Sequence, residues 1–314
     1  MKSSLFVLFF LFKSVLLDLQ NKNLTDLTFV ENLVHLNDSH IDISNNMISL
    51  IHINMSVVFS NWTDLHNLIL DNNCIQVLKP NSFTTLVSLK DLSFQQNKIV
   101  FIHTGAFNGL KKLILLSLEG NNLVNLKKGM FDGLDNLENL FLSQNHIEWI
   151  EDGVFSPLGS LTYLHMNKNK IRTLWPGTLS GLVNLNMLDL SKNSIHHISS
   201  QVFFNLKKIT NLDLAGNNLV NLTFGMLIGL DRLQYLFLNN NKIKVIRPNA
   251  LASLKKLNYI DLSSNHLRSV NFLCSTNINF TFQIFKCDQQ FEYFYEQEDI
   301  GCGKKSEIKK TCKK

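Results

Sequence analysis

The chain has 314 residues, 45% of them hydrophobic, a content that supports a packed core and excludes a disordered polypeptide. Its formal net charge of +5 is matched by residues 303–314 alone, which hold six lysines and one glutamate. Taking these from the 30 basic and 25 acidic residues leaves 24 of each, so we do not expect a basic surface for nucleic acid. The lysines are typical of a solvated tail, with binding to a heparin-like or membrane surface as the alternative.

Residues 1–18 begin with Lys2 and continue in an apolar run from Leu5 to Phe12. A basic start before such a run predicts a secretory signal peptide, although Lys13 interrupts it. A buried first element of the fold is the alternative. The run is shorter than the roughly 20 residues that cross a bilayer, so we expect no transmembrane segment and a secreted, extracellular protein.

Residues 41–270 repeat the pattern L-x-L-x-x-N-x-L-x-x-L, with other apolar residues allowed at the leucine places. From Leu68 to Ile260 the start of the pattern advances by 24 residues eight times without a slip. Residues 19–40 match only in part, with Lys22 at the asparagine place, and are interpreted as a degenerate first repeat or N-terminal cap. All ten full copies have asparagine at the sixth place: Asn46, Asn73, Asn97, Asn121, Asn145, Asn169, Asn193, Asn217, Asn241 and Asn265.

Each copy predicts one coil of a solenoid. Alternate side chains of a strand point to the same face, so the leucines of L-x-L face inward together. One coil cannot bury them alone, and stacked coils form a continuous parallel sheet. The asparagine can satisfy turn backbone groups with its donor and its acceptor. The outer side is filled by a column that includes Phe83, Phe107, Phe131, Phe155 and Phe203.

Glycine-containing segments such as FNGL (107–110) and FDGL (131–134) fit short turns on that outer side. Crowded strands inside and bulkier connections outside should bend the stack. The sequence therefore predicts an α/β solenoid in the shape of an arc. Its parallel β-sheet should lie on the concave face, with loops, 3-10 turns or short helices on the convex face.

These repeats resemble the extracellular branch of the leucine-rich repeat family, which includes Toll-like receptor ectodomains, Slit and secreted insect immune proteins. The resemblance covers residues 41–270 and rests on the 24-residue period, the asparagine and the phenylalanine column. It implies a horseshoe-shaped protein that recognises a protein or glycoconjugate partner through its concave face, in immune, cell-surface or matrix recognition.

Residues 271–314 carry no further repeat and hold four of the five cysteines. Four clustered cysteines in an exported chain predict two disulfides, for which three pairings are open. The family resemblance implies a C-terminal cap in which Cys274 pairs with Cys302 and Cys287 with Cys312. Cys74 lies alone upstream and is expected to be a free thiol.

Six N-x-S/T sequons occur, and the abundance of Asn, Ser and Thr would produce about as many by chance. The sequon at Asn23 lies next to the predicted signal peptide. The candidate glycosylation sites are Asn37, Asn54, Asn61, Asn221 and Asn279.

Enzyme signatures are missing: the chain has no G-x-S-x-G, H-E-x-x-H, phosphate-loop or dinucleotide-binding motif. The adjacent pair His196 and His197 is expected to be plain surface. We therefore predict a non-enzymatic protein without a metal or cofactor. Two alternatives to concave-face binding stay open: a structural or assembly subunit acting through its ends or convex face, alone or with other chains, and a truncated receptor ectodomain.

The informative residues are those that face outward from the predicted concave sheet. Exposed aromatic side chains on a rigid sheet are typical of binding hot spots. The aspartates have a competing interpretation, because L-D-L-S is close to the default wording of such repeats. The partner-binding candidates are Phe141, Tyr163, His165, Met187, Asp189, Asp213, Tyr235, Phe237, Tyr259 and Asp261.

Overall fold

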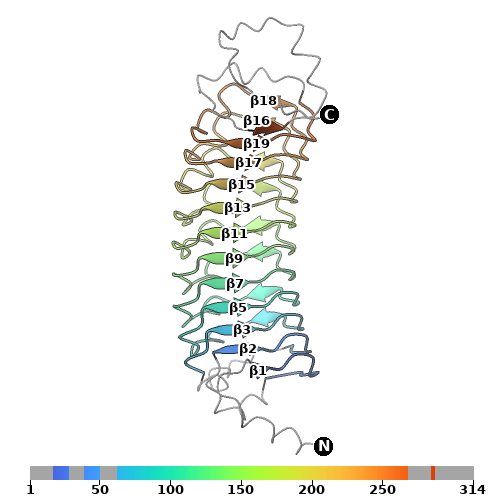
Figure 1. Cartoon of the computed structure of the whole chain (residues 1–314), viewed down its shortest axis with the longest axis vertical. Helices are drawn as coiled ribbons and strands as arrows, with labels where there is room; N and C mark the ends of the chain where they lie inside the picture. The colour runs from blue at the N-terminus through green and yellow to red at the C-terminus, as the bar shows by residue number, and fades with distance from the viewer. Residues whose placement is uncertain (1–16, 28–38, 50–61, 268–283, 287–314) are drawn as a thin grey trace, which may run out of the picture.

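A computed structural model of the chain describes residues 17–27, 39–49, 62–267 and 284–286, which contain strands and turns but no helix (Figure 1). One twelve-stranded sheet runs the length of the stack, and all its neighbouring strands are parallel. In sheet order it contains β1 (Leu17–Asp18), β2 (His40–Asp42), β3 (Asn67–Ile69), β5 (Asp91–Ser93), β7 (Leu115–Ser117), β9 (Asn139–Phe141), β11 (Tyr163–His165), β13 (Met187–Asp189), β15 (Asn211–Asp213), β17 (Tyr235–Phe237), β19 (Tyr259–Asp261) and β20 (Ile284–Lys286).

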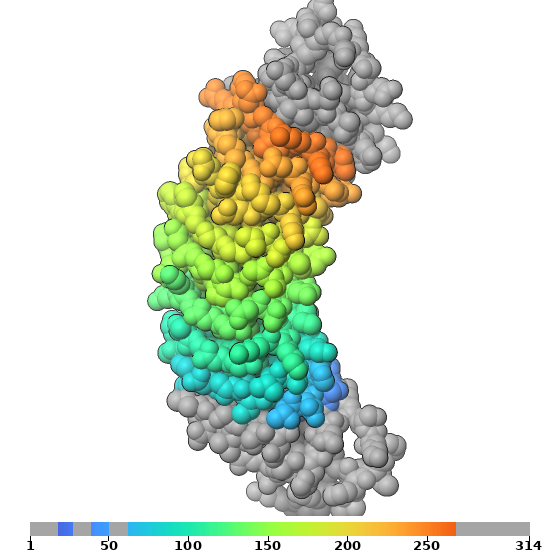
Figure 2. Space-filling view, turned by 90° about the vertical axis from the view of Figure 1, so that its left-hand side faces the viewer, coloured from blue at the N-terminus to red at the C-terminus, as the bar shows by residue number. Residues whose placement is uncertain are grey.

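The predicted repeats and the observed coils coincide. Each full repeat contributes one strand to the sheet, and the first leucines of successive repeats align, as Leu140 does with Leu164. β1 aligns Leu17 with Ile41, so the two residues that end the predicted signal peptide pair with the first full repeat. The arc-shaped parallel solenoid is therefore confirmed, and the strands of the long sheet follow its inner, concave side (Figures 1 and 2).

The sixth-place asparagines form a ladder inside the stack. Asn145 is 3% exposed, and its Nδ2 donates to the carbonyl oxygens of Leu118 (2.9 Å) and Leu142 (3.1 Å). Its Oδ1 accepts the N–H of Leu123 at 3.1 Å. Two of these three partners belong to the preceding coil, so each asparagine fixes its own turn and ties it to its neighbour. The expected role of this residue is confirmed.

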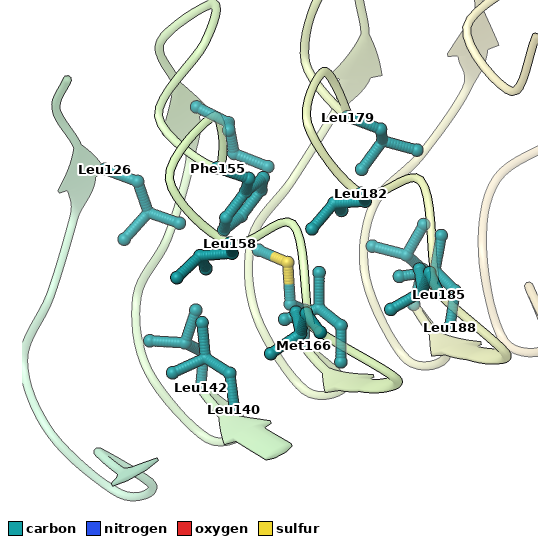
Figure 3. Close-up of a cluster of buried hydrophobic side chains, with 14 of the residues drawn as sticks. Leu126, Leu140, Leu142, Phe155, Leu158, Met166, Leu179, Leu182, Leu185 and Leu188 are labelled. Atoms are coloured by element: carbon teal, nitrogen blue, oxygen red, sulfur yellow. The ribbon is translucent and has the colours of Figure 1, made fainter. Parts of the chain in front are cut away.

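The core is a continuous column of aliphatic and aromatic side chains. Figure 3 shows Leu140 and Leu142 pointing into the coil toward Phe155 and Leu158, all four of them fully buried. Phe131 stacks on Phe155 with ring centroids 6.0 Å apart, and both belong to the predicted phenylalanine column. Burying a leucine or phenylalanine contributes about 2 kcal/mol, so the repeated core supplies most of the favourable free energy of folding.

In each coil a segment after the sixth-place asparagine forms one side of the stack. In the described residues four small sheets lie on this side, and the sequence did not predict them. Each is a parallel pair of two-residue strands from neighbouring coils. The pairs are β4 (Val77–Leu78) with β6 (Phe101–Ile102), β8 (Asn125–Leu126) with β10 (Trp149–Ile150), β12 (Thr173–Leu174) with β14 (His197–Ile198), and β16 (Asn221–Leu222) with β18 (Val245–Ile246). The remaining connections in the described coils are turns, bends and irregular segments.

Glycines let the outer turns approach one another. Gly181 has a φ of +96°, and a Cβ placed on it would lie 2.5 Å from the carbonyl oxygen of Phe155 in the preceding coil. Gly159 has open space around it, so only some glycines are required by packing. The LSGL segment (179–182), which contains Gly181, forms a short turn of the kind expected for FNGL and FDGL.

Candidate functional site

The concave face is built from the first and third residue of each strand. The middle residue is buried, as Leu164 is, while its neighbours Tyr163 and His165 reach the surface. Because the strands are parallel and in register, equivalent residues line up across the sheet in two columns. The sequence pattern therefore decides which side chains meet on this face.

The first predicted aromatic cluster lies at the middle of the sheet. Phe141 and His165 stack nearly parallel, with an interplanar angle of 11° and ring centroids 4.9 Å apart. Tyr163 is 39% exposed and stands in register with Met187 on the next strand. All four candidates thus share three adjacent strands, β9, β11 and β13, and present a flat aromatic surface with an apolar edge.

The second cluster lies toward the C-terminal end. Tyr259 packs against Phe237 at 5.3 Å and against Tyr235 at 6.4 Å between ring centroids. Its hydroxyl donates a hydrogen bond of 3.2 Å to the carboxylate of Asp261. Tyr235 is 40% exposed, so the cluster is open to solvent while its rings hold one another in place. The three predicted aromatic residues of this cluster are therefore brought together.

The predicted aspartates share a local bond. In each, Oδ1 accepts the backbone N–H two residues further along: Ser191 for Asp189 (2.9 Å), Ala215 for Asp213 (2.8 Å) and Ser263 for Asp261 (3.0 Å). This bond closes the end of the strand. It supports the interpretation of these residues as turn-forming. Asp261 is only 8% exposed, so little of it faces solvent.

Asp213 is electrostatically unusual. Burial, together with the negative charges of Asp189 and Asp261, raises its pKa from the ordinary value of 3.8 to about 6. The N–H of Ala215 and the positive charge of Lys192 act in the opposite direction. The carboxylate therefore changes its charge in the mildly acidic range, on the face between the two aromatic clusters.

Nearer the N-terminal end the face is polar. The carboxylate of Asp71 accepts a hydrogen bond from the hydroxyl of Ser93 (2.6 Å) and from the N–H of Gln95 (2.7 Å). Burial raises the pKa of Asp71, while these two bonds lower it. Ser117 occupies the place equivalent to Ser93 on the next strand. Expected to face outward, it is 1% exposed, and its hydroxyl has no hydrogen-bond partner in the described structure.

Several sequence predictions fall outside the described residues: Cys274, Cys287, Cys302 and Cys312, and the sequons at Asn37, Asn54, Asn61 and Asn279. Asn221 is described and lies exposed in β16. Cys74 is a partly buried free thiol. His196 and His197 are exposed, as expected for surface residues.

The described ranges hold neither a cluster of metal-binding side chains nor a membrane-spanning helix. No three side chains of His, Cys, Asp or Glu gather there in a way that could hold a metal ion. Those ranges also contain no apolar helix of membrane-spanning length.

Sequence reasoning missed the side of the coils that carries the small sheets. Trp149 is 53% exposed there and Trp175 44%, and Trp175 contacts His197 at 5.7 Å between rings. Two of the three tryptophans of the chain therefore lie largely in solvent. In the other coils, the two repeat positions that Trp149 and Trp175 occupy are not regularly apolar, so they do not belong to the core. This could have identified both tryptophans as surface residues from the sequence.

Comparison with known families and structures supports the geometry. The family described as "Leucine rich repeat" matches residues 63–123, 113–171, 167–219 and 210–267, which together cover most of the chain. A search of curated proteins finds no significant match.

Solved structures with the same fold include complexes of TLR13, Toll and FLRT2. The TLR13–ssRNA13 complex matches with 27% identity and a TM-score of 0.71, over 80% of this chain and 36% of that one. The Drosophila Toll–Spatzle complex matches with 20% identity and a TM-score of 0.71, over 88% and 38%. The octameric complex of Latrophilin 3, Unc5D and FLRT2 matches with 23% identity and a TM-score of 0.62, over 75% and 77%. The chain thus spans about a third of the TLR13 and Toll chains.

Proposed function

This chain belongs to the leucine-rich repeat family, and from that premise we propose that it is a secreted, non-enzymatic binding protein that recognises a protein or glycoconjugate partner through its concave sheet. The observation that carries the proposal is the pair of aromatic clusters on that sheet. Their rings are ordered by contact with one another, as in Phe141 with His165, yet remain open to solvent. Aromatic side chains held rigidly lose little conformational freedom on binding, which makes them effective anchors.

Charge narrows the partner class. Asp71, Asp91, Glu119, Asp189 and Asp213 contribute carboxylates to the concave face. Lys168 and Lys192, in the turns that leave the strands, lie beside these carboxylates. A phosphate backbone would be repelled by such a face, so we propose a partner with a neutral or basic surface. The TLR13 structure contains single-stranded RNA, which makes RNA a necessary control ligand.

The extracellular assignment is part of the proposal. It is supported by the apolar N-terminal run, by the four clustered cysteines, and by the receptor ectodomains among the similar structures. The Arabidopsis receptor kinase ectodomain GASSHO1/SCHENGEN3, crystallised with CASPARIAN STRIP INTEGRITY FACTOR 2, is another of these, with 24% identity and a TM-score of 0.61 over 87% of this chain and 32% of that one.

The test combines partner capture with a matched surface control. A variant with alanine at Phe141, Tyr163, Tyr235 and Phe237 should lose the partner that co-purifies with the wild-type protein from culture medium. Its melting temperature should stay near that of the wild type, because these side chains lie on the surface rather than in the core.

The control replaces three exposed apolar residues of the outer turns by alanine: Val87, Val183 and Phe204. It removes apolar surface without touching the concave sheet, and it should retain the partner. If the concave variant still captured the partner, or if only the control lost it, the partner would be recognised by a surface other than the concave sheet. Binding of single-stranded RNA in place of a protein or glycan would overturn the proposed partner class.

A further inference from the structure

The side of the coils that carries the small sheets has an exposed apolar surface. We call it the tryptophan flank and define it by seven residues in the coils of β6 to β16: Val100 (53% exposed), Phe101 (38%), Val124 (41%), Trp149 (53%), Trp175 (44%), Val220 (39%) and Phe224 (67%). Single exposed apolar residues are ordinary, but several large ones on one surface mark an interaction site. The flank is separate from the concave sheet and has no part in the function proposed above.

Ring and cation contacts place these residues on one surface. The ammonium of Lys127 lies 5.7 Å from the ring of Phe101 in the preceding coil. Trp149 and Trp175 occupy the same two places of the repeat as Phe101 and Lys127, also in consecutive coils. The two tryptophans therefore lie in adjacent coils of the flank, and Trp175 packs on His197 of the coil that follows.

The charges beside the tryptophans change sign between two consecutive coils. The coil of β10 exposes Glu148, Glu151 and Asp152. The coil of β12 exposes Lys170 and Arg172. Glu148 and Arg172 occupy equivalent places, 24 residues apart, directly before β10 and β12. When a second copy is rotated by 180° about an axis between these two coils, its basic coil faces the acidic coil of the first copy, and its acidic coil faces the basic one.

We infer that the tryptophan flank binds the same flank of a second copy of this chain, about a two-fold axis between β10 and β12. In that arrangement Glu148 of each copy faces Arg172 of the other. The order of coils along the flank then sets Val100 and Phe101 opposite Val220 and Phe224, so apolar residues also meet apolar residues. Asn221 lies between Val220 and Phe224, so this arrangement requires that its sequon carries no glycan.

The same symmetry limits the interface. One coil further out, Lys79 would meet the coil of Lys244 and Arg247, where like charges repel. The contact therefore covers six coils, a strip about 30 Å long at the usual spacing of parallel strands. Both tryptophans lie next to its centre, which is where buried aromatic anchors contribute most to binding.

The self-association of the full chain, followed by sedimentation equilibrium over micromolar concentrations, tests this arrangement by charge exchange. Glu148→Arg alone and Arg172→Glu alone each place like charges together twice per dimer, and each should weaken the dimer by about tenfold. The double variant restores opposite charges and should recover the wild-type affinity. A mixture of the two single variants should form a heterodimer that is tighter than either homodimer.

Trp149→Ser should abolish the dimer without lowering the melting temperature, because the side chain lies mostly in solvent. The alanine variant of the concave clusters should dimerise normally, so this proposal and the proposed function fail independently. A wild-type chain that stays monomeric at these concentrations would overturn the inference. The same conclusion would follow from single swaps that the double swap does not rescue, or from a dimer lost only in the concave variant.

Discussion

The asparagine column inside the stack and the aspartates on its concave face are both repeated polar residues, and both accept a backbone N–H through a side-chain oxygen. Their reach differs. Asn193 accepts the N–H of Ile171 from the preceding coil and donates to the carbonyls of Met166 and Leu190. Among the described residues, Asp189 accepts the N–H of Ser191, two residues away, and no bond from another coil. The first set of bonds joins coils, whereas the second closes one turn.

This difference explains why one column is uniform and the other varied. A buried asparagine satisfies several groups that water cannot reach, and no other side chain has the same donor, acceptor and size. At the aspartate place the turn lies next to solvent, so its N–H can be hydrated instead. Phe141, His165 and Phe237 stand at that place in other coils. The inner column therefore preserves the fold, and the outer column is free to carry recognition.

The largest effect should come from breaking the inner column at one coil. Asn145→Ala leaves the N–H of Leu123 and the carbonyls of Leu118 and Leu142 buried without their partner. We expect a loss of about 3 kcal/mol in the free energy of unfolding, measured by urea denaturation. Asn125→Ala, at an exposed position of the same region, is the matched control and should change stability little. Equal losses in the two variants would contradict the ladder.

The inner columns could be predicted from the sequence, because every coil must solve the same packing problem with the same residues. The strand positions from Leu68 to Ile260, the asparagine ladder and the buried Phe83, Phe107, Phe131, Phe155 and Phe203 all follow from the 24-residue period. The grouping of Phe141 with His165, and of Tyr235 with Tyr259, follows from the register of parallel strands.

The outer features could not be predicted in this way. The pairing of β8 with β10 depends on how closely two turns approach, and no residue pattern marks it. The burial of Ser117 depends on the side chains of neighbouring coils rather than on its own place in the repeat. Periodicity specifies what all coils share, so it says little about positions where they differ.

An intermediate effect on stability is expected from Asp213, a charged residue of the outer column. Because the folded pKa of Asp213 is about 6, above the ordinary value of 3.8, ionising this group opposes folding. Its contribution to stability is favourable at low pH and is lost as the pH rises from about 4 to about 6. Asp213→Asn keeps an oxygen for the N–H of Ala215 but removes the charge.

The Asp213→Asn variant should therefore be more stable than the wild type above pH 6, by about 1 kcal/mol once partial solvent exposure is allowed for. Below about pH 4 the gain should vanish, because the wild-type carboxyl is then neutral in both states. Thermal unfolding across this range measures it. Asp231→Asn, which removes an exposed carboxylate from an outer turn, controls for the change in net charge. A gain that is independent of pH would exclude ionisation of Asp213 as the cause.

The smallest effect is expected at Ser93 and Ser117, which stand in register on neighbouring strands of the concave face. Replacing them should change the free energy of unfolding in opposite directions. Ser93 donates to Asp71 at 2.6 Å, whereas the hydroxyl of Ser117 is buried with no partner in the described structure. Removing a satisfied hydroxyl loses its bond, and removing an unsatisfied one relieves its desolvation penalty. Ser93→Ala should therefore lower the free energy of unfolding by about 1 kcal/mol, and Ser117→Ala should raise it by up to about 1 kcal/mol.

Urea denaturation of the two variants side by side measures the difference in their free energies of unfolding. Equal destabilisation by Ser117→Ala and Ser93→Ala would mean that the second position of the repeat has the same role in every coil. It would contradict the claim that outer positions, unlike inner ones, differ in role from coil to coil.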